Sequence, residues 1–183
     1  MNDQPQERTP ERNPGAPARP ARRVPRDCGD FAIRIARDGT WYYEGSPIAR
    51  PALVRLFSTV LKRDADGVYW LETPVEKGRV EVEDAPFTAV ELAVAGRSRD
   101  RVLQFRTNVD TWIEAGPDHP IRVTEDPQTR EPRPYLLVRD GLEALIVRSV
   151  YYELVALGVE EKATFGVWSK NAFFALGPAG EAP

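Results

Sequence analysis

Several arginines in this sequence stand where their side chains could bind an anion. Arg106 and Asn108 project from one side of the stretch FRTN, which is predicted to be a strand, and Arg139 and Arg148 border the stretch RDGLEALIVR. The rigid donor fork of arginine suits phosphate and carboxylate oxygens. The alternative is that these arginines form ion pairs that join two parts of the chain, because carboxylates are plentiful (Glu76, Glu114, Glu143 and Glu153).

Other polar and aromatic residues extend this candidate site. Thr73, Glu76 and Lys77 follow a predicted strand, and Trp112 and Trp168 are candidates for stacking on a nucleotide base, although most tryptophans belong to a core. The predicted ligand-binding residues are therefore Thr73, Glu76, Lys77, Arg106, Asn108, Trp112, His119, Arg139, Arg148 and Trp168.

The scarcity of histidine and cysteine restricts the chemistry. With only His119 and Cys28, neither a zinc site of Cys and His ligands nor a disulfide can form within one chain. His119 lies among turn residues in GPDHPIRV, where a histidine either braces a loop or acts as a base or ligand donor. The sequence contains no GxxxxGK, GxGxxG, HExxH or GxSxG pattern. These absences predict no catalytic residue, metal or cofactor, and favour a protein that is not an enzyme.

Three carboxylates offer the alternative of metal chemistry. On a strand, Glu81 and Glu83 project from one face and, together with Asp84, could hold Mg²⁺ for a small metal-assisted hydrolase. The same alternation is typical of the solvent-exposed face of a half-buried strand. Both interpretations stay open at the level of the sequence.

The elements that position these residues follow from hydrophobic periodicity. FAIRIAR, at 31–37, alternates like a half-buried strand, Asp38-Gly39 predicts a hairpin turn, and TWYYEG returns as a second strand. Pro51 opens a helix with one apolar stripe over residues 53–61. Short strands from 68, 79, 87 and 102 then predict an antiparallel sheet or partial barrel.

The tripeptide Arg-Asp-Gly occurs twice, at 37–39 and 139–141, and each copy precedes an apolar run and a helical pattern. This order of elements predicts an α+β fold of two similar antiparallel-sheet-plus-helix units that arose by duplication. The alternative is that GLEALI, at 141–146, forms a helix, because Leu and Ala favour helices. We expect the units at 27–124 and 125–183, joined by the Pro-rich stretch 125–134.

Residues 1–26 are predicted to be a disordered tail rich in Pro and Arg. The tail has a net charge of +3 and the remainder −6, which argues against a whole surface built for nucleic acid but allows a local basic pocket. No apolar run is long enough to cross a membrane and no signal peptide is evident, so we expect a cytoplasmic protein without membrane contacts.

Five segments in order carry a resemblance to a protein family: 28–61 (CGDFAIRIARDGTWYYEG and onward), TPVEKGRVEVEDAPF, FRTNVDTWIEAGPDHPIRV, PYLLVRDGLEALIVRSVYYELV and GVWSKNAFFALG. They resemble the proteobacterial family known as domain of unknown function 1285, over nearly everything after residue 27. The resemblance implies a duplicated α+β core whose second half is pleckstrin-homology-like. It also implies a ligand site between the halves for a nucleic-acid-based ligand, and signalling under oxidative stress.

The hypothesis that follows is a ligand-binding or signalling protein that binds a nucleotide-like anion between its two halves. The competing hypotheses are the metal-assisted hydrolase and a scaffold for protein partners, since pleckstrin-like sheets present peptide grooves. The oligomeric state is left undetermined.

Overall fold

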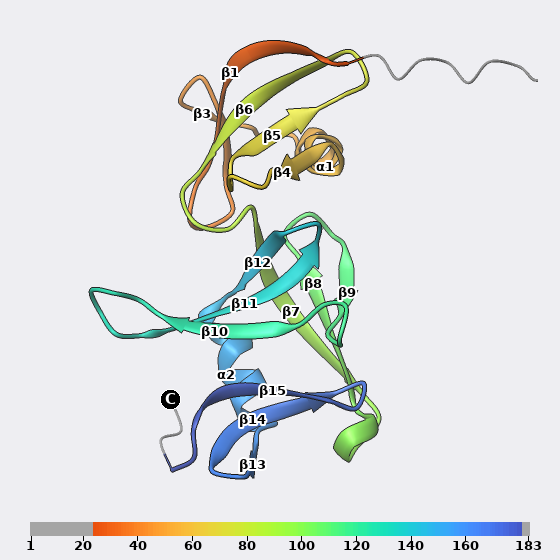
Figure 1. Cartoon of the computed structure of the whole chain (residues 1–183), viewed down its shortest axis with the longest axis vertical. Helices are drawn as coiled ribbons and strands as arrows, with labels where there is room; N and C mark the ends of the chain where they lie inside the picture. Colours follow the sequence, from red (N-terminus) through yellow and green to blue (C-terminus); the bar gives the residue numbers. More distant parts are fainter. Residues whose placement is uncertain (1–23, 181–183) are drawn as a thin grey trace, which may run out of the picture.

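The computed structural model describes residues 24–180, so the expected tail lies outside the described residues except for its last three positions. Residues 24–180 form two six-stranded sheets, two helices and a small three-stranded sheet, arranged along the long axis of the molecule (Figure 1). The first unit contains β1 (Arg26–Ile35), β2 (Trp41–Tyr43), β3 (Ser46–Pro47), α1 (Pro51–Thr59), β4 (Leu61–Arg63), β5 (Tyr69–Glu72) and β6 (Glu76–Val82).

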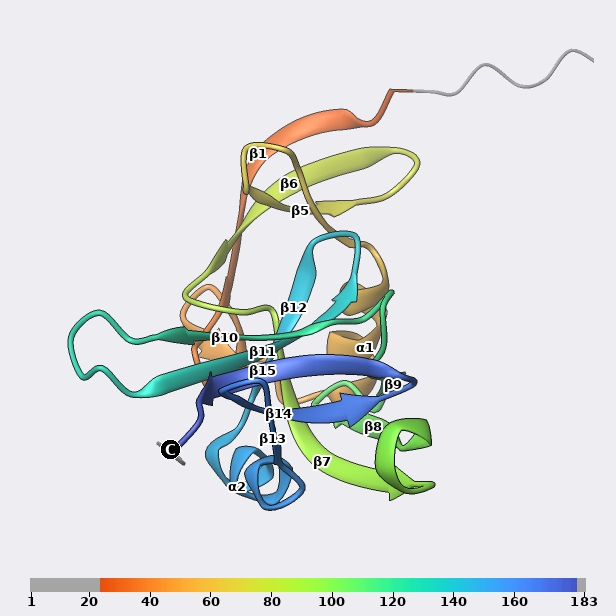
Figure 2. The same ribbon diagram turned by 60° about the horizontal axis from the view of Figure 1, so that its bottom comes forward.

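A segment of four residues, 83–86, separates β6 from the second unit. Its sheet contains β7 (Phe87–Ala95), β8 (Val102–Thr107), β9 (Trp112–Glu114), β10 (Ile121–Glu125), β11 (Pro132–Arg139) and β12 (Leu142–Ile146), with a 3-10 turn at Ser98–Asp100. α2 (Arg148–Ala156), β13 (Val159–Glu161), β14 (Thr164–Ser169) and β15 (Ala172–Pro178) follow. The second sheet curls into a half-barrel, and α2 and the small sheet lie at its far end (Figures 1 and 2).

The two large sheets share one topology. In the order β3-β2-β1-β6-β5-β4, the first and last strands of the unit lie side by side and parallel at the centre. In the order β10-β11-β12-β7-β8-β9, β7 and β12 likewise lie side by side and parallel at the centre of the second sheet. Each unit is therefore a pair of antiparallel three-stranded meanders joined by a parallel central pair, which confirms an α+β fold built from two similar units.

Three details differ from the sequence-based expectation. Each sheet is mixed, because its central pair is parallel. Both Arg-Asp-Gly turns form hairpins, the first between β1 and β2 and the second between β11 and β12. The first turn follows the central strand β1, whereas the second turn precedes the central strand β12, so the two turns are not equivalent in the order of strands. The sheet boundary lies at residues 83–86, whereas a boundary between 124 and 125 would separate the paired strands β10 and β11.

Local sequence explains the elements next to the junction of the units. Pro51 starts α1, where its missing N–H has no helical partner to lose. Asp140 and Gly141 both adopt positive φ, 42° and 74°, and let β11 turn tightly into β12. LEALI is a strand, because its alternate residues are buried against the second sheet's core. Here burial on one face outweighs the helical propensity of Leu and Ala.

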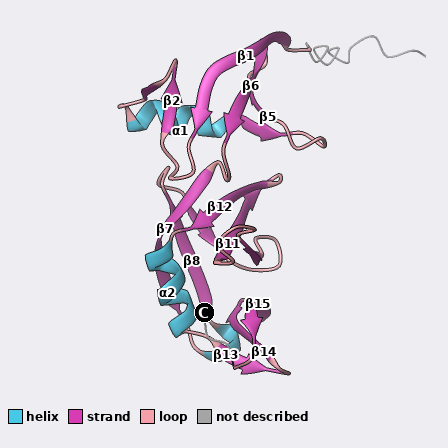
Figure 3. Cartoon of the chain, turned by 90° about the vertical axis from the view of Figure 1, so that its left-hand side faces the viewer, coloured by secondary structure: helices cyan, strands magenta, loops and turns pink. Residues whose placement is uncertain are grey.

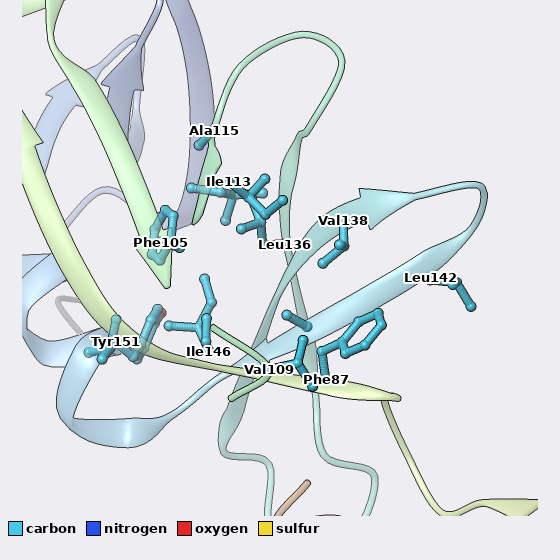
Figure 4. Packing of buried hydrophobic residues seen from close by; sticks show 14 of the residues in the cluster. Phe87, Phe105, Val109, Ile113, Ala115, Leu136, Val138, Leu142, Ile146 and Tyr151 are labelled. Carbon is cyan, nitrogen blue, oxygen red and sulfur yellow. The ribbon is translucent and has the colours of Figure 1, made fainter. Parts of the chain in front are cut away.

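One continuous cluster of buried side chains runs through both units. In the first unit Trp41 stacks on Phe57 of α1 with ring centroids 6.5 Å apart. In the second unit Phe87, Phe105 and Leu136 are fully buried between the arms of the curled sheet (Figure 4). The junction is therefore a packed interior that fixes the two units relative to each other.

No helix among residues 24–180 is long and apolar enough to cross a membrane.

Candidate functional site

A pocket of about 410 Å³ lies where the first unit meets the second, and we call it the junction pocket. The β1–β2 turn of the first unit contributes Arg37 to its wall. The second unit contributes the β10–β11 turn with the start of β11, the end of β12 and the start of α2. Its volume falls within the roughly 300–1,000 Å³ typical of small-molecule sites.

Arg37 is held at the pocket by its backbone rather than by its side chain. Its N–H donates to Oε2 of Glu83 at 3.0 Å, and the following Asp38 accepts from the N–H of Thr40 at 2.9 Å. That backbone hydrogen bond lowers the pKa of Asp38, so the turn is braced by a charged carboxylate. The guanidinium of Arg37 makes no ion pair or hydrogen bond with any residue in the described range, and it is exposed to solvent.

Arg133 forms the inner wall of the pocket within a network of charges. It pairs with Asp84, in the segment between the sheets, and with Asp126 at 3.0 Å, at the start of the β10–β11 turn. These three side chains are only 14–18% exposed. Burial, the largest single influence, lowers the pKa of Arg133, but Asp84, Tyr135 and Asp126 together raise it by more, so the guanidinium stays charged. Tyr135 donates to the other oxygen of Asp84 at 2.8 Å.

Arg148 stands at the first turn of α2 on the outer rim. Its guanidinium donates to Oε1 of Glu131 at 2.8 Å, across the pocket mouth from helix to hairpin. The side chains are 68% and 58% exposed, so water screens the pair and it contributes little to stability. A more highly charged anion could replace Glu131 as the partner of Arg148.

Tyr151 lines the pocket, but its hydroxyl is buried away from the pocket surface and is unpaired. The residue is 4% exposed, and its hydroxyl has no hydrogen-bond partner among residues 24–180. Burial raises the pKa of Tyr151, so the hydroxyl remains a neutral donor. Its neighbour Tyr152 also lines the pocket and is 54% exposed, which leaves an aromatic ring for a flat ligand group.

The side chains that line the pocket carry a net positive charge, which favours an anion. Arg37, Arg133 and Arg148 face Asp126 and Glu131, a balance of +1 for the lining residues. Two of the arginines have carboxylate partners and one has none. The pocket therefore combines one free guanidinium with one rim guanidinium in an exposed pair, and the two together suit phosphate oxygens.

The residues predicted from sequence fall into several places. Arg139, Asn108 and Arg106 lie near the junction but make contacts within the chain. Arg139 donates to the backbone oxygen of Ser58, and Asn108 donates to the oxygen of Gly39 at 3.0 Å. Arg106 pairs with Glu91 at 2.6 Å and with Asp110, which also pairs with Arg55 of α1.

The remaining predicted residues are scattered. Of the predicted set, Arg148 lines the junction pocket, whereas Thr73 and Glu76 line another pocket in the first unit. Lys77 lies over the ring of Trp70 at 4.5 Å, and Trp112 is 46% exposed on β9. His119 places Nδ1 3.1 Å from the oxygen of Leu137, and Trp168 lies beneath Arg99 at 4.5 Å.

The three carboxylates of the metal hypothesis do not gather. Glu83 pairs with Arg34 and braces Arg37, and Asp84 pairs with Arg133. Glu81 is an exposed residue of β6. Within the described range no group of three His, Cys, Asp or Glu side chains could hold a metal ion. The side-chain positions therefore give the hydrolase hypothesis no support.

Sequence reasoning missed Arg37, Arg133 and Tyr151. Arg37 and Arg133 were visible as charged residues beside a predicted turn and inside the Pro-rich connection, and Tyr151 lay on the predicted helix. No local pattern links the three, because they come together only when β11 and α2 meet the first hairpin.

The fold and the pocket define a class of protein: two similar, mostly β units with a cationic pocket where they meet. Residues 21–85 match the family model "Domain of unknown function (DUF1285), N-terminal domain", and residues 86–176 match "Protein of unknown function (DUF1285), C-terminal domain". The chain belongs to the DUF1285 family, as its sequence segments indicated. The models divide at 85/86, where the sheets divide.

Solved structures agree with this assignment. A DUF1285 family protein from Silicibacter pomeroyi DSS-3 is 50% identical, with a TM-score of 0.82 over 90% of this chain and 91% of that one. A DUF1285 family protein from Shewanella baltica OS155 is 29% identical, with a TM-score of 0.54 over 69% of this chain and 91% of that one. No curated protein matches the chain.

Proposed function

We propose that this protein binds a small phosphate-bearing ligand, of the nucleotide class, in the junction pocket. The observation that carries the proposal is the free guanidinium of Arg37 in the same pocket as Arg148 and the exposed ring of Tyr152. A guanidinium without a carboxylate partner, beside a second arginine at the pocket rim, suits the oxygens of a phosphate group.

The geometry favours a ligand with a charged end and a flat end. The phosphate oxygens bind Arg37 and Arg148, and the base packs on the ring of Tyr152. Because Arg37 comes from the first unit and Arg148 and Tyr152 from the second, the ligand links the units. Occupancy then strengthens the junction, which is the change a signalling protein needs.

Cys28 supplies no support for the role in oxidative stress that the family resemblance implies. Desolvation and the hydrogen bond to Glu76 raise the pKa of its thiol, which disfavours the reactive thiolate. Cys28 also lies outside the junction pocket. A lone cysteine does fit a reducing compartment, and we place the protein in the cytoplasm, where nucleotides are available.

A thermal-shift titration with AMP, ADP, GTP, cyclic di-GMP and hexathymidylate tests the proposal, with adenosine as the phosphate-free control. At a concentration 100 times Kd, binding adds about 2.7 kcal/mol to the folded state. For a chain of this size that raises Tm by roughly 5–10 °C. Increasing the salt concentration weakens the effect, because the rim charges are exposed to solvent.

Two variants locate the site. Arg37→Gln and Arg148→Gln abolish or reduce the shift, while Arg50→Gln, which removes an exposed charge outside the pocket, leaves it unchanged. The proposal is wrong if no phosphate-bearing compound shifts Tm, or if both pocket variants respond like the unmodified chain.

A further inference from the structure

We propose that the first unit binds an extended, cationic peptide of a partner protein as an extra strand along β1. The site is separate from the junction pocket. It consists of the N-terminal part of β1, residues 26–31, which we call the open edge, and of the surfaces on either side of it.

The open edge is left unpaired because β2 is much shorter than β1. β2 pairs only with residues 33–35 of β1, and a hydrogen bond of 2.8 Å from the N–H of Glu44 to the oxygen of Ala32 ends the ladder. On its other side β1 pairs with β6 from Arg26 onward. Within the described part of the chain, residues 26–31 therefore have a strand on one side and none on the other (Figures 1 and 3).

Two pockets meet at this edge, one on each face of the sheet. The pocket on the α1 face has a volume of about 480 Å³ and is lined by Phe57, Val60 and Leu71. The pocket on the opposite face has a volume of about 430 Å³ and reaches Arg79 and Glu81. Both pockets include residues 30–33 and Glu44. An added strand would send alternate side chains into the two pockets, while its backbone bonds to β1.

The charge around the edge selects a cationic occupant. Asp30, Glu44, Glu76 and Glu81 lie in the two pockets, together with only Arg34 and Arg79 as cations. Both arginines already have carboxylate partners, Arg34 with Glu83 and Arg79 with Asp30. Glu44, Glu76 and Glu81 make no ion pair with any residue in 24–180. Lysine or arginine side chains of a peptide would supply the missing partners.

The same features disfavour a second copy of this chain as the occupant. Two open edges brought together would place acidic side chains opposite one another, which is destabilising. Gly29, with a φ of 74°, and the register shifts after Asp27 and Asp30 also bend the edge, so a flexible peptide can follow it more readily than a second folded edge can. A partner with alternating apolar and basic side chains avoids the repulsion and fills the apolar pocket.

Fluorescence anisotropy with the full chain and a labelled peptide, acetyl-KVKVKVKVK-amide, tests the proposal. We expect saturable binding, no binding of the EVEVEVEVE peptide, and a large loss when alternate backbone amides of the Lys/Val peptide are N-methylated. N-methylation keeps the charge but removes the donors that an added strand requires. Equal binding of the methylated peptide would mean attraction by charge alone and would overturn the proposal.

Charge-reversing variants place the peptide on the protein. Glu44→Lys and Glu76→Lys each weaken binding by about fivefold or more. Glu153→Lys, which makes the same change on an exposed position of α2, leaves binding unchanged. If the control weakens binding as much as the two edge variants, the assignment to β1 is wrong.

Hydrogen exchange distinguishes other occupants. Bound peptide slows the exchange of those amides within residues 27–31 that point away from β6, and these amides exchange fast in the free monomer. Protection that is already present in the free monomer would show that the same chain covers the edge. Protection that appears only with dimerisation at high concentration would assign the edge to a second copy. Either result overturns the proposal.

Discussion

Replacing Gly39 by alanine tests how firmly the β1–β2 turn joins the two units. Gly39 has a φ of +85°, and a Cβ at this position would lie 2.7 Å from Nδ2 of Asn108 and 3.0 Å from Oγ1 of Thr88. Asn108 links the units, because it accepts from the N–H of Thr88 at 3.1 Å and donates to the oxygen of Gly39 at 3.0 Å. The added methyl group must therefore displace the Asn108 amide.

The expected loss is about 3 kcal/mol in the free energy of unfolding. A left-handed φ costs alanine about 1 kcal/mol relative to glycine, and two displaced hydrogen bonds cost about 1 kcal/mol each. Gly45→Ala is the matched control, because Gly45 has a φ of +78° and nothing within 4 Å of its Cβ position. Gly45→Ala should lower the free energy of unfolding only by the cost of the left-handed φ, about 1 kcal/mol.

Urea unfolding followed by tryptophan fluorescence measures both free energies. A double-mutant cycle with Asn108→Ala should be strongly non-additive, because one side chain provides both the clash and the lost hydrogen bonds. If Gly39→Ala costs no more than Gly45→Ala, the contact between the turn and Asn108 does not hold the units together and our account of the junction is refuted.

Three further predictions address the pocket and the junction. Tyr151→Phe should raise the free energy of unfolding of the ligand-free protein by about 1 kcal/mol, because it removes a buried hydroxyl without a partner; an unchanged or lower value in urea unfolding would mean that the hydroxyl is satisfied. Arg139→Met should lower that free energy by about 1 kcal/mol, because it removes the hydrogen bond that the guanidinium donates to the backbone oxygen of Ser58; equal urea midpoints would contradict this. Backbone N–H groups of Thr40 and of Thr129 lower the pKa values of Asp38 and Asp126. The stabilisation of the folded state by these carboxylates is therefore complete above the ordinary pKa of about 4 and is lost as the pH falls through the lowered values. Asp126→Asn should flatten the fall in stability below pH 4, and a pH profile parallel to that of the unmodified chain would count against this prediction.

Local signals predicted the hairpins and helices well. Asp38-Gly39 and Asp140-Gly141 carry the positive φ angles that tight turns need, and Lys170-Asn171 forms the β14–β15 turn with φ angles of 48° and 61°. The proline at the start of α1 marked the helix start. The parallel pairing of β1 with β6 and of β7 with β12 had no local signal, because strands distant in sequence meet there. The repeat in topology therefore differs from the repeat of the tripeptide.

The candidate site was harder to predict than the fold. Arginine chemistry pointed to the junction, and Arg148 does line the pocket. Arg106 pairs with Glu91 within the second unit, and Arg139 donates to a backbone oxygen of the first unit. The alternative interpretation instead proposes ion pairs that join two parts of the chain. A guanidinium is free, as that of Arg37 is, or paired according to the position of a carboxylate on a distant strand. Such positions follow from the tertiary structure and cannot be read from neighbouring residues.

The central parallel pairs set the order in which the chain can fold during synthesis. β1 leaves the ribosome early, but its long partner β6 ends at Val82, so the first sheet stays in two halves until that strand emerges. The second sheet waits in the same way for β12. Contacts between strands so distant in sequence slow folding. The nascent protein should therefore mature in two late steps, each triggered by the arrival of one strand, and ribosome-bound fragments stalled before either step should be sensitive to protease.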